Sequence, residues 1–98
     1  MKRVCSQPYI KIERLIQDFK QKIVEKEEFL HLCDHYITTP THQFHLKEVH
    51  DLSFRTIHKD SGLLYLHTNQ GLFAYHVKLT PHRFMDAFQE LKQRYFET

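Results

Sequence analysis

The chain has 98 residues, of which 41% are hydrophobic and 27% are charged, with nine histidines and only two glycines. A chain of this length can bury roughly 60–70% of the surface that its unfolded form exposes, so we expect a single domain over residues 1–98. Fourteen basic and twelve acidic side chains give a net charge of +2. This balance lacks the concentrated basic surface that phosphate backbones require, and we expect no nucleic-acid partner.

The cysteines and the first residues bear on the compartment. Cys5 and Cys33 form no CxxC pair and no disulfide framework, so we expect two reduced thiols, with a single bridge between them as the alternative. Pro8 and Lys11 interrupt the apolar run that a signal peptide needs. The longest apolar stretch, 63–66, falls far short of the roughly 20 residues of a membrane helix. The sequence predicts a cytoplasmic protein that does not insert into a membrane.

Residues 9–24 fit a helix and a strand equally well. The alternation of apolar and charged residues over 10–13 is typical of a strand. Five apolar residues nevertheless recur at helical spacing, namely Ile12, Leu15, Ile16, Phe19 and Ile23. Farther along, the segments 29–33, 36–39 and 43–47 look extended, and Pro40 separates the last two, so the sequence predicts short strands there.

Two polar clusters that end in glycine predict hairpin turns at 59–62 and 69–71. The runs around them are rich in aromatic and branched residues and predict three antiparallel strands, over 52–58, 63–68 and 72–77. A three-residue loop at 69–71 would place Thr68 opposite Leu72. In that register His67 and His76 point to opposite faces, so His58, His67 and His76 are not expected to converge.

The spacing of apolar residues changes after residue 77. They now recur on one side of a helix, as Phe84, Phe88, Leu91 and Tyr95, and polar residues cover the other side. Thr80 is a suitable N-cap and Pro81 suits the first helical position. The sequence therefore predicts an amphipathic helix over 81–96.

Several strands followed by one amphipathic helix is the element order of pleckstrin-homology-like (PH-like) folds. The stretch FHLKEVHDLSFR at 44–55, followed by LLYLHTNQGLFAY at 63–75, resembles small bacterial PH-like proteins with the pattern F-x-L-x-x-V-x-D-L-S-[FY]-R before Y-L-H-T-x-x-G-x-F. The resemblance covers about residues 43–96. It implies an α+β, mainly β fold, in which a strongly curved antiparallel sheet or partly open seven-stranded barrel carries one C-terminal helix. It also implies that residues 9–33 supply early strands, and it implies no activity.

Lipid-binding members of the wider PH class carry paired basic residues near the first hairpin. Lys20, Lys22 and Lys26 are the residues of this chain that could take that role. Four acidic residues surround them and nearly cancel the local charge, namely Asp18, Glu25, Glu27 and Glu28. We therefore favour a solvated hairpin of mixed charge over a site for an anionic headgroup.

The best metal candidate is the set His31, Cys33 and His35. In an extended strand these three residues share one face and could present nitrogen, sulfur and nitrogen ligands to zinc. A structural zinc site needs a fourth protein ligand, and zinc ligands usually come as pairs from separate elements. Burial of the apolar neighbours, with the histidines at the rim, is the simpler interpretation.

The sequence carries no motif of a known catalytic site. There is no GxSxG, P-loop, HExxH or dinucleotide glycine pattern, and two glycines are too few for a phosphate cradle. We expect a non-enzymatic binding or protein-interaction module without a cofactor, whose partner is a protein or peptide, with self-association by edge-strand pairing as one form. A metal-binding or redox protein using His31, Cys33 and His35 is the alternative.

Overall fold

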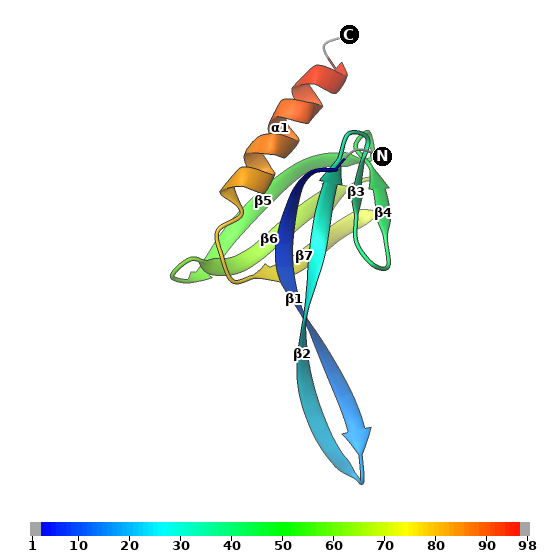
Figure 1. The fold of residues 1–98 in the computed structure, drawn as a ribbon, viewed down its shortest axis with the longest axis vertical. Helices are drawn as coiled ribbons and strands as arrows, with labels where there is room; N and C mark the ends of the chain where they lie inside the picture. Colours follow the sequence, from blue (N-terminus) through cyan, green and yellow to red (C-terminus); the bar gives the residue numbers. More distant parts are fainter. Residues whose placement is uncertain (1–2, 97–98) are drawn as a thin grey trace.

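The structure is a computed structural model that describes residues 3–96, and the side chains of residues 3–94. It contains seven strands and one helix: β1 (Arg3–Gln17), β2 (Lys20–Cys33), β3 (Tyr36–Thr38), β4 (Gln43–His45), β5 (Val49–His58), β6 (Ser61–Thr68), β7 (Gly71–Val77) and α1 (His82–Phe96). The strands form one antiparallel sheet in the order β4-β3-β2-β1-β7-β6-β5, which is not closed into a barrel (Figure 1). This confirms the expected α+β class with one C-terminal helix.

Residues 9–24, which fitted a helix and a strand equally well, form strand. They belong to a long hairpin in which β1 and β2 are paired from Arg3↔Cys33 to Gln17↔Lys20. Its turn consists of Asp18 and Phe19, both with positive φ, at 54° and 62°. Two such residues are the mark of a type I′ turn, whose twist matches that of the flanking strands. The helical spacing of the apolar residues in this segment is therefore overruled by strand pairing.

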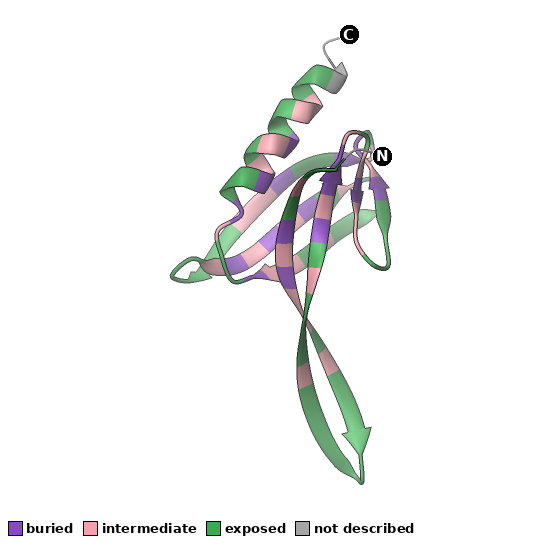
Figure 2. Cartoon of the chain, in the orientation of Figure 1, coloured by how far each residue is buried: buried purple, intermediate pink, exposed green. Residues whose placement is uncertain are grey.

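The core lies between the inner face of the sheet and α1. Leu64 and Leu66 of β6 are fully buried, as are Phe84 and Phe88 on the inner side of the helix. Two polar contacts fix the helix over the sheet: Lys92 Nζ donates to the Leu46 carbonyl at 2.9 Å, and Gln89 Nε2 donates to Asp51 at 2.9 Å. The buried residues lie within 3–10 and 29–96, which we call the body (Figure 2). The helical spacing of Phe84 and Phe88 thus identified the buried side of α1 correctly, while the side chain of Tyr95 lies outside the described residues.

The β5–β6 turn differs from the prediction of a turn that ends in Gly62. The loop is the pair Lys59-Asp60, and Lys59 has the positive φ, at 50°. Gly62 lies inside β6, opposite Thr56, where it is buried. An added Cβ there would lie 2.0 Å from the Arg55 carbonyl oxygen. Gly62 is therefore needed because two strands approach closely, and it is not the residue that turns the chain.

The β6–β7 register was predicted wrongly by one residue. Thr68 pairs with Gly71, not with Leu72, because the loop has two residues, 69 and 70, and Gly71 opens β7 with φ 130°. His67 consequently pairs with Leu72 and His76 with Leu63, so these two histidines share the outer face of the sheet. They are four residues apart along that face, roughly 13 Å, so they still do not converge.

The helix begins at His82, close to the predicted residue 81. Thr80 was predicted to cap it, and its hydroxyl instead donates to the Asp60 carbonyl at 3.2 Å. This contact ties the start of the helix to the β5–β6 turn. Pro81 is fully buried beside it.

Candidate functional site

The three candidate metal ligands lie at the body end of β2. Nδ1 of His31 is 2.7 Å from the Ser6 hydroxyl, and burial together with the nearby charge of Arg3 lowers the pKa of His31. Cys33 is buried at the last position of the strand. His35 follows a bend, is exposed, and stacks its ring 6.5 Å from that of His45.

The bend matters because strand alternation was the argument for placing the three side chains together. The alternation of side chains ends at Cys33, because β2 ends there. Within residues 3–96 the structure contains no group of three or more His, Cys, Asp or Glu side chains that could hold a metal ion. The set His31, Cys33 and His35 is therefore not assembled as a ligand group.

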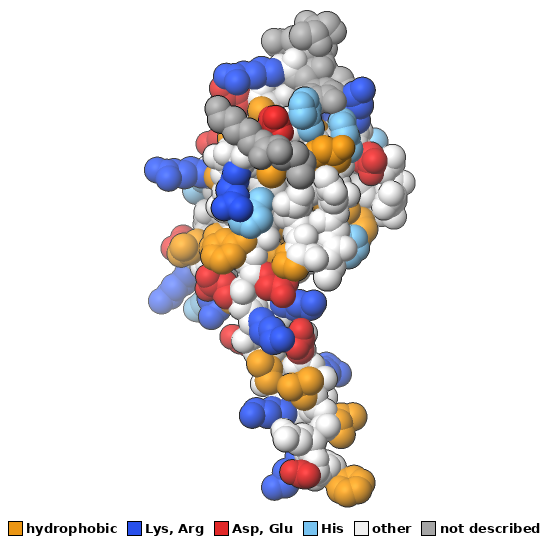
Figure 3. All heavy atoms as spheres, turned by 45° about the vertical axis from the view of Figure 1, so that its right-hand side comes forward, with side chains coloured by type: hydrophobic (Ala, Val, Ile, Leu, Met, Phe, Trp, Pro, Cys, Tyr) orange, Lys and Arg blue, Asp and Glu red, His pale blue; other side chains and the backbone are white. Residues whose placement is uncertain are grey.

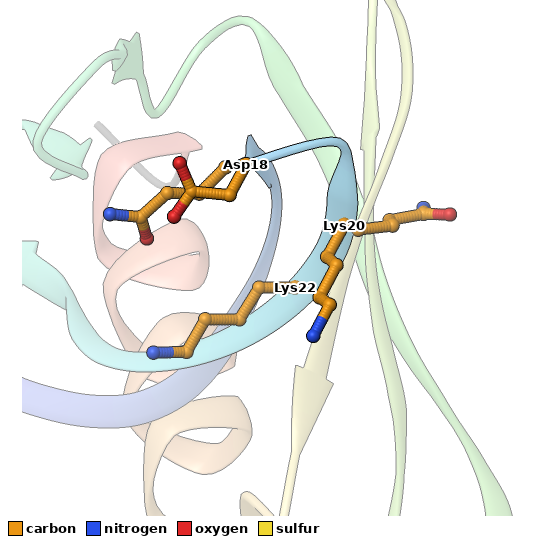
Figure 4. Close-up of a pocket in the computed structure, with 5 residues that line it drawn as sticks. Asp18, Lys20 and Lys22 are labelled. Carbon is orange, nitrogen blue, oxygen red and sulfur yellow. The ribbon is translucent and has the colours of Figure 1, made fainter.

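The three lysines considered for an anionic headgroup are spread along the β1–β2 hairpin. Lys20 and Lys22 extend from β2 next to the turn, near Asp18, around an open hollow of about 360 Å³ (Figure 4). Lys26 lies farther back and its Nζ is 3.3 Å from Glu13 Oε2. The hollow lies at the tip of a two-stranded hairpin, so no second layer of protein encloses a ligand there.

The outer part of this hairpin is the most unusual feature of the chain. Among the described residues, β1 pairs with β7 only at Ile10↔His76, and β2 pairs with β3 only at His31 and Leu32. Residues 11–28, which we call the arm, are therefore a two-stranded ribbon that projects from the body on the side away from α1 (Figure 1). The molecule reaches 57 Å along this direction and only 28 and 24 Å across.

The two faces of the arm differ in chemistry. Directly paired residues of an antiparallel hairpin share a face, and the outer face of this one carries five successive pairs. They are Pro8↔Phe29, Ile10↔Glu27, Ile12↔Glu25, Arg14↔Ile23 and Ile16↔Gln21. Neighbouring isoleucines on this face are diagonal to one another, so Ile12, Ile23 and Ile16 form a continuous line. We call the line from Pro8 and Phe29 through these isoleucines to Phe19 at the turn the outer strip.

The outer strip is open to solvent. Ile12, Ile16 and Ile23 are 55%, 83% and 63% exposed, and Phe19 is fully exposed. The opposite face of the arm is net basic, with four lysines and two glutamates among the residues Lys11, Glu13, Leu15, Gln17, Lys20, Lys22, Val24, Lys26 and Glu28. Figure 3 shows hydrophobic side chains along the arm and at its end, between charged ones. The two faces of the arm thus differ, and the isoleucines of its outer face beyond Ile10 stay largely uncovered by the described chain.

A small cavity of about 230 Å³ lies at the base of the arm. It is lined by Pro8, Tyr9, Ile10, Glu27, Lys78 and Leu79. The Leu79 side chain stands exposed at its rim, and Lys78 Nζ lies 3.9 Å from Glu25 Oε2. The Tyr9 hydroxyl donates to Glu28 at 2.9 Å, and burial and this carboxylate raise the pKa of Tyr9. The cavity is therefore apolar in its centre, charged at its edge, and continuous with the outer strip.

Sequence reasoning missed the outer strip. Its signal was present in the alternation around Ile10 and Ile12, but the helical spacing of the same apolar residues concealed it. Comparison of the chain with models of known families, with curated proteins and with solved structures finds no match. No helix among residues 3–96 is long and apolar enough to cross a membrane.

Proposed function

We propose that this chain is a non-enzymatic protein-interaction module of PH-like fold, and that the outer strip of the arm is its binding surface. The observation that carries the proposal is Phe19. This residue occupies a turn position with φ 62°, a conformation that costs a bulky side chain free energy and that glycine adopts freely. Its ring is nevertheless fully exposed and gains no packing in return.

A strained aromatic residue without packing is not explained by the stability of the isolated chain. Backbone strain at an exposed position is more often found where a residue serves binding or a switch. Phe19 alone exposes roughly 150–250 Å². Together with the exposed isoleucines it gives a surface that reaches the roughly 300–600 Å² of the largest apolar patches on soluble monomers.

The free edges of the arm support the same proposal. A two-stranded hairpin is marginally stable by itself in water, and unpaired strands with exposed apolar side chains are contact sites for other chains. Here the ribbon continues well beyond the last residue that pairs with the body on the β7 side, Ile10. A surface packed on the outer strip would both cover the isoleucines and stabilise the ribbon.

The test uses a photoreactive benzoylphenylalanine at position 16, on the outer strip, and at position 22, on the basic face. We expect irradiation in native extract to give covalent adducts from position 16 and few from position 22. Equal labelling from both positions, or none from position 16, would contradict the proposal. Circular dichroism of both variants checks that the fold is unchanged.

A further inference from the structure

The charge pattern of the outer strip identifies a specific partner. We propose that a second copy of this chain packs on it, with the two arms face to face and antiparallel, so that the tip of each arm lies at the base of the other. This inference rests on the proposed function, because it names the partner of the same surface.

The five pairs on the outer face form rows, roughly 6.6 Å apart along the arm. A twofold axis between the Ile12–Glu25 row and the Arg14–Ile23 row brings these two rows onto each other in the two copies. Such an axis runs across the arms, so β1 lies over the partner's β1 and β2 over the partner's β2. Within the superposed rows Ile12 lies diagonally opposite the partner's Ile23, and the Glu25 carboxylate lies diagonally opposite the partner's Arg14. Both contacts occur twice, because the interface is isologous.

The remaining rows also match in this arrangement. The Ile10–Glu27 row lies on the partner's Ile16–Gln21 row, which pairs isoleucine with isoleucine and a carboxylate with an amide. The Pro8–Phe29 row lies on the partner's turn. Each apolar residue of the strip thereby finds an apolar partner.

The parallel arrangement is excluded by charge. If the tips of two arms lay side by side, every row would face its own copy. The twofold axis would then run along the arms and lay β1 over the partner's β2, so that the two copies of Glu25 lie diagonally opposite each other, as do those of Glu27 and those of Arg14. Like charges at such short range repel, so the same strip selects the antiparallel dimer.

The antiparallel dimer also explains the cavity and the turn. It places the partner's Phe19 over the row of Pro8, which lines the cavity, beside the exposed ring of Phe29. A cavity of about 230 Å³ with an apolar centre accepts an aromatic ring. The strained position of Phe19 then has a role: the ring is an anchor, of the kind that carries most of the affinity of an interface.

The faces of the arms, and not the edges of the sheet, make this contact. It therefore differs from the edge-strand pairing expected from the sequence. Two strips of this size bury less than the roughly 1,600 Å² of a standard interface. We accordingly expect a dimer that dissociates at micromolar concentrations and exchanges rapidly.

Sedimentation velocity of the purified chain from about 1 to about 500 µM is the test. We expect a monomer–dimer equilibrium. R14E and E25R should each raise the dissociation constant roughly tenfold or more, because each reversal creates two repulsive contacts per dimer. The double variant R14E/E25R restores both pairs in the opposite sense and should return the constant toward that of the wild type. K22E, on the other face of the arm, is the matched control.

A wild-type chain that stays monomeric up to about 500 µM overturns the proposal, and so does a double variant no better than the two single ones. Cosedimentation of that monomer with vesicles of anionic phospholipid would assign the strip to a lipid surface instead. The proposed function can fail separately. If position 16 labels an unrelated protein in extract while the purified chain is monomeric, the interaction surface stands and the second copy is wrong.

Discussion

The arm and the β6–β7 hairpin of the body are built alike but end differently. Both are antiparallel hairpins with two-residue loops, and in both the side chains alternate between the two faces along each strand. In β6 the apolar positions Leu64 and Leu66 are covered by other parts of the core. In the arm the same alternation continues past the last contact with β7, so its isoleucines face solvent. The comparison shows that a strand pattern specifies which residues need covering and leaves open what covers them.

The largest expected effect comes from exchanging one apolar residue in each region. Phe88→Ala should lower the free energy of unfolding by about 3–5 kcal/mol, because the ring is buried against the sheet. Ile16→Ala in the arm should change it by less than about 0.5 kcal/mol. Urea denaturation at a concentration where the chain is monomeric measures both. Similar losses would mean that the arm is covered within a single chain.

The second effect separates two glycines in neighbouring hairpins of the body. Gly62→Ala should lower the free energy of unfolding by about 2–3 kcal/mol. The new methyl group would collide with the Arg55 carbonyl, so β5 and β6 would have to move apart. Gly71 has open space around it, so Gly71→Ala should cost only the strain of its positive φ, about 1 kcal/mol. Thermal melts of the two variants compare them. A larger loss at Gly71 would contradict the close approach at Gly62.

Elements with one dominant local signal were predictable from the sequence. The helix was found because Phe84 and Phe88 repeat with its period, and the three strands of the β5–β7 meander were found because polar clusters separate them. The register failed because a glycine can either lie in a loop, as expected of Gly71, or open the next strand, as it does. That choice depends on one residue of loop length, which composition does not reveal.

The arm and its outer strip were not predictable for a different reason. The residues from Ile12 to Ile23 satisfy a helical and a strand spacing together, and only pairing between β1 and β2 decides between them. The three metal candidates are not brought together in the structure, because the strand ends at Cys33 and the alternation of His31, Cys33 and His35 does not reveal the bend that follows. For the arm, the decisive interaction is the pairing of two strands, which is not local in the sequence.

The third effect tests the turn of the arm. Phe19→Gly gives the turn the sequence Asp-Gly, which the type I′ turn prefers. We expect the free energy of unfolding of the monomer to rise by about 0.5–1 kcal/mol, because strain at φ 62° is relieved. The same variant should raise the dimer dissociation constant by roughly 100-fold, since it removes two aromatic anchors. If the variant instead lowered both the free energy of unfolding and the affinity of the dimer, Phe19 would support the fold and not the contact.

The smallest effect lies where the arm's two strands enter the body. Burial and Arg3 lower the pKa of His31, so the unfolded chain binds a proton there more readily than the folded chain. Stability linked to this group is therefore present above about pH 6.5 and is lost as the pH falls through the lower pKa of the folded state.

We expect the melting temperature of the wild type to fall more between pH 7 and pH 5.5 than that of His31→Gln, which cannot titrate. Each protein is compared with itself at the two pH values, so the difference between the two pH dependences isolates the contribution of His31 from that of the eight other histidines. Identical slopes would mean that His31 is as accessible to protons in the folded body as in the unfolded chain. The place where the arm meets the body would then be as accessible to solvent as the arm itself. The boundary between the exposed arm and the buried core would lie closer to the core than Ser6 and His31.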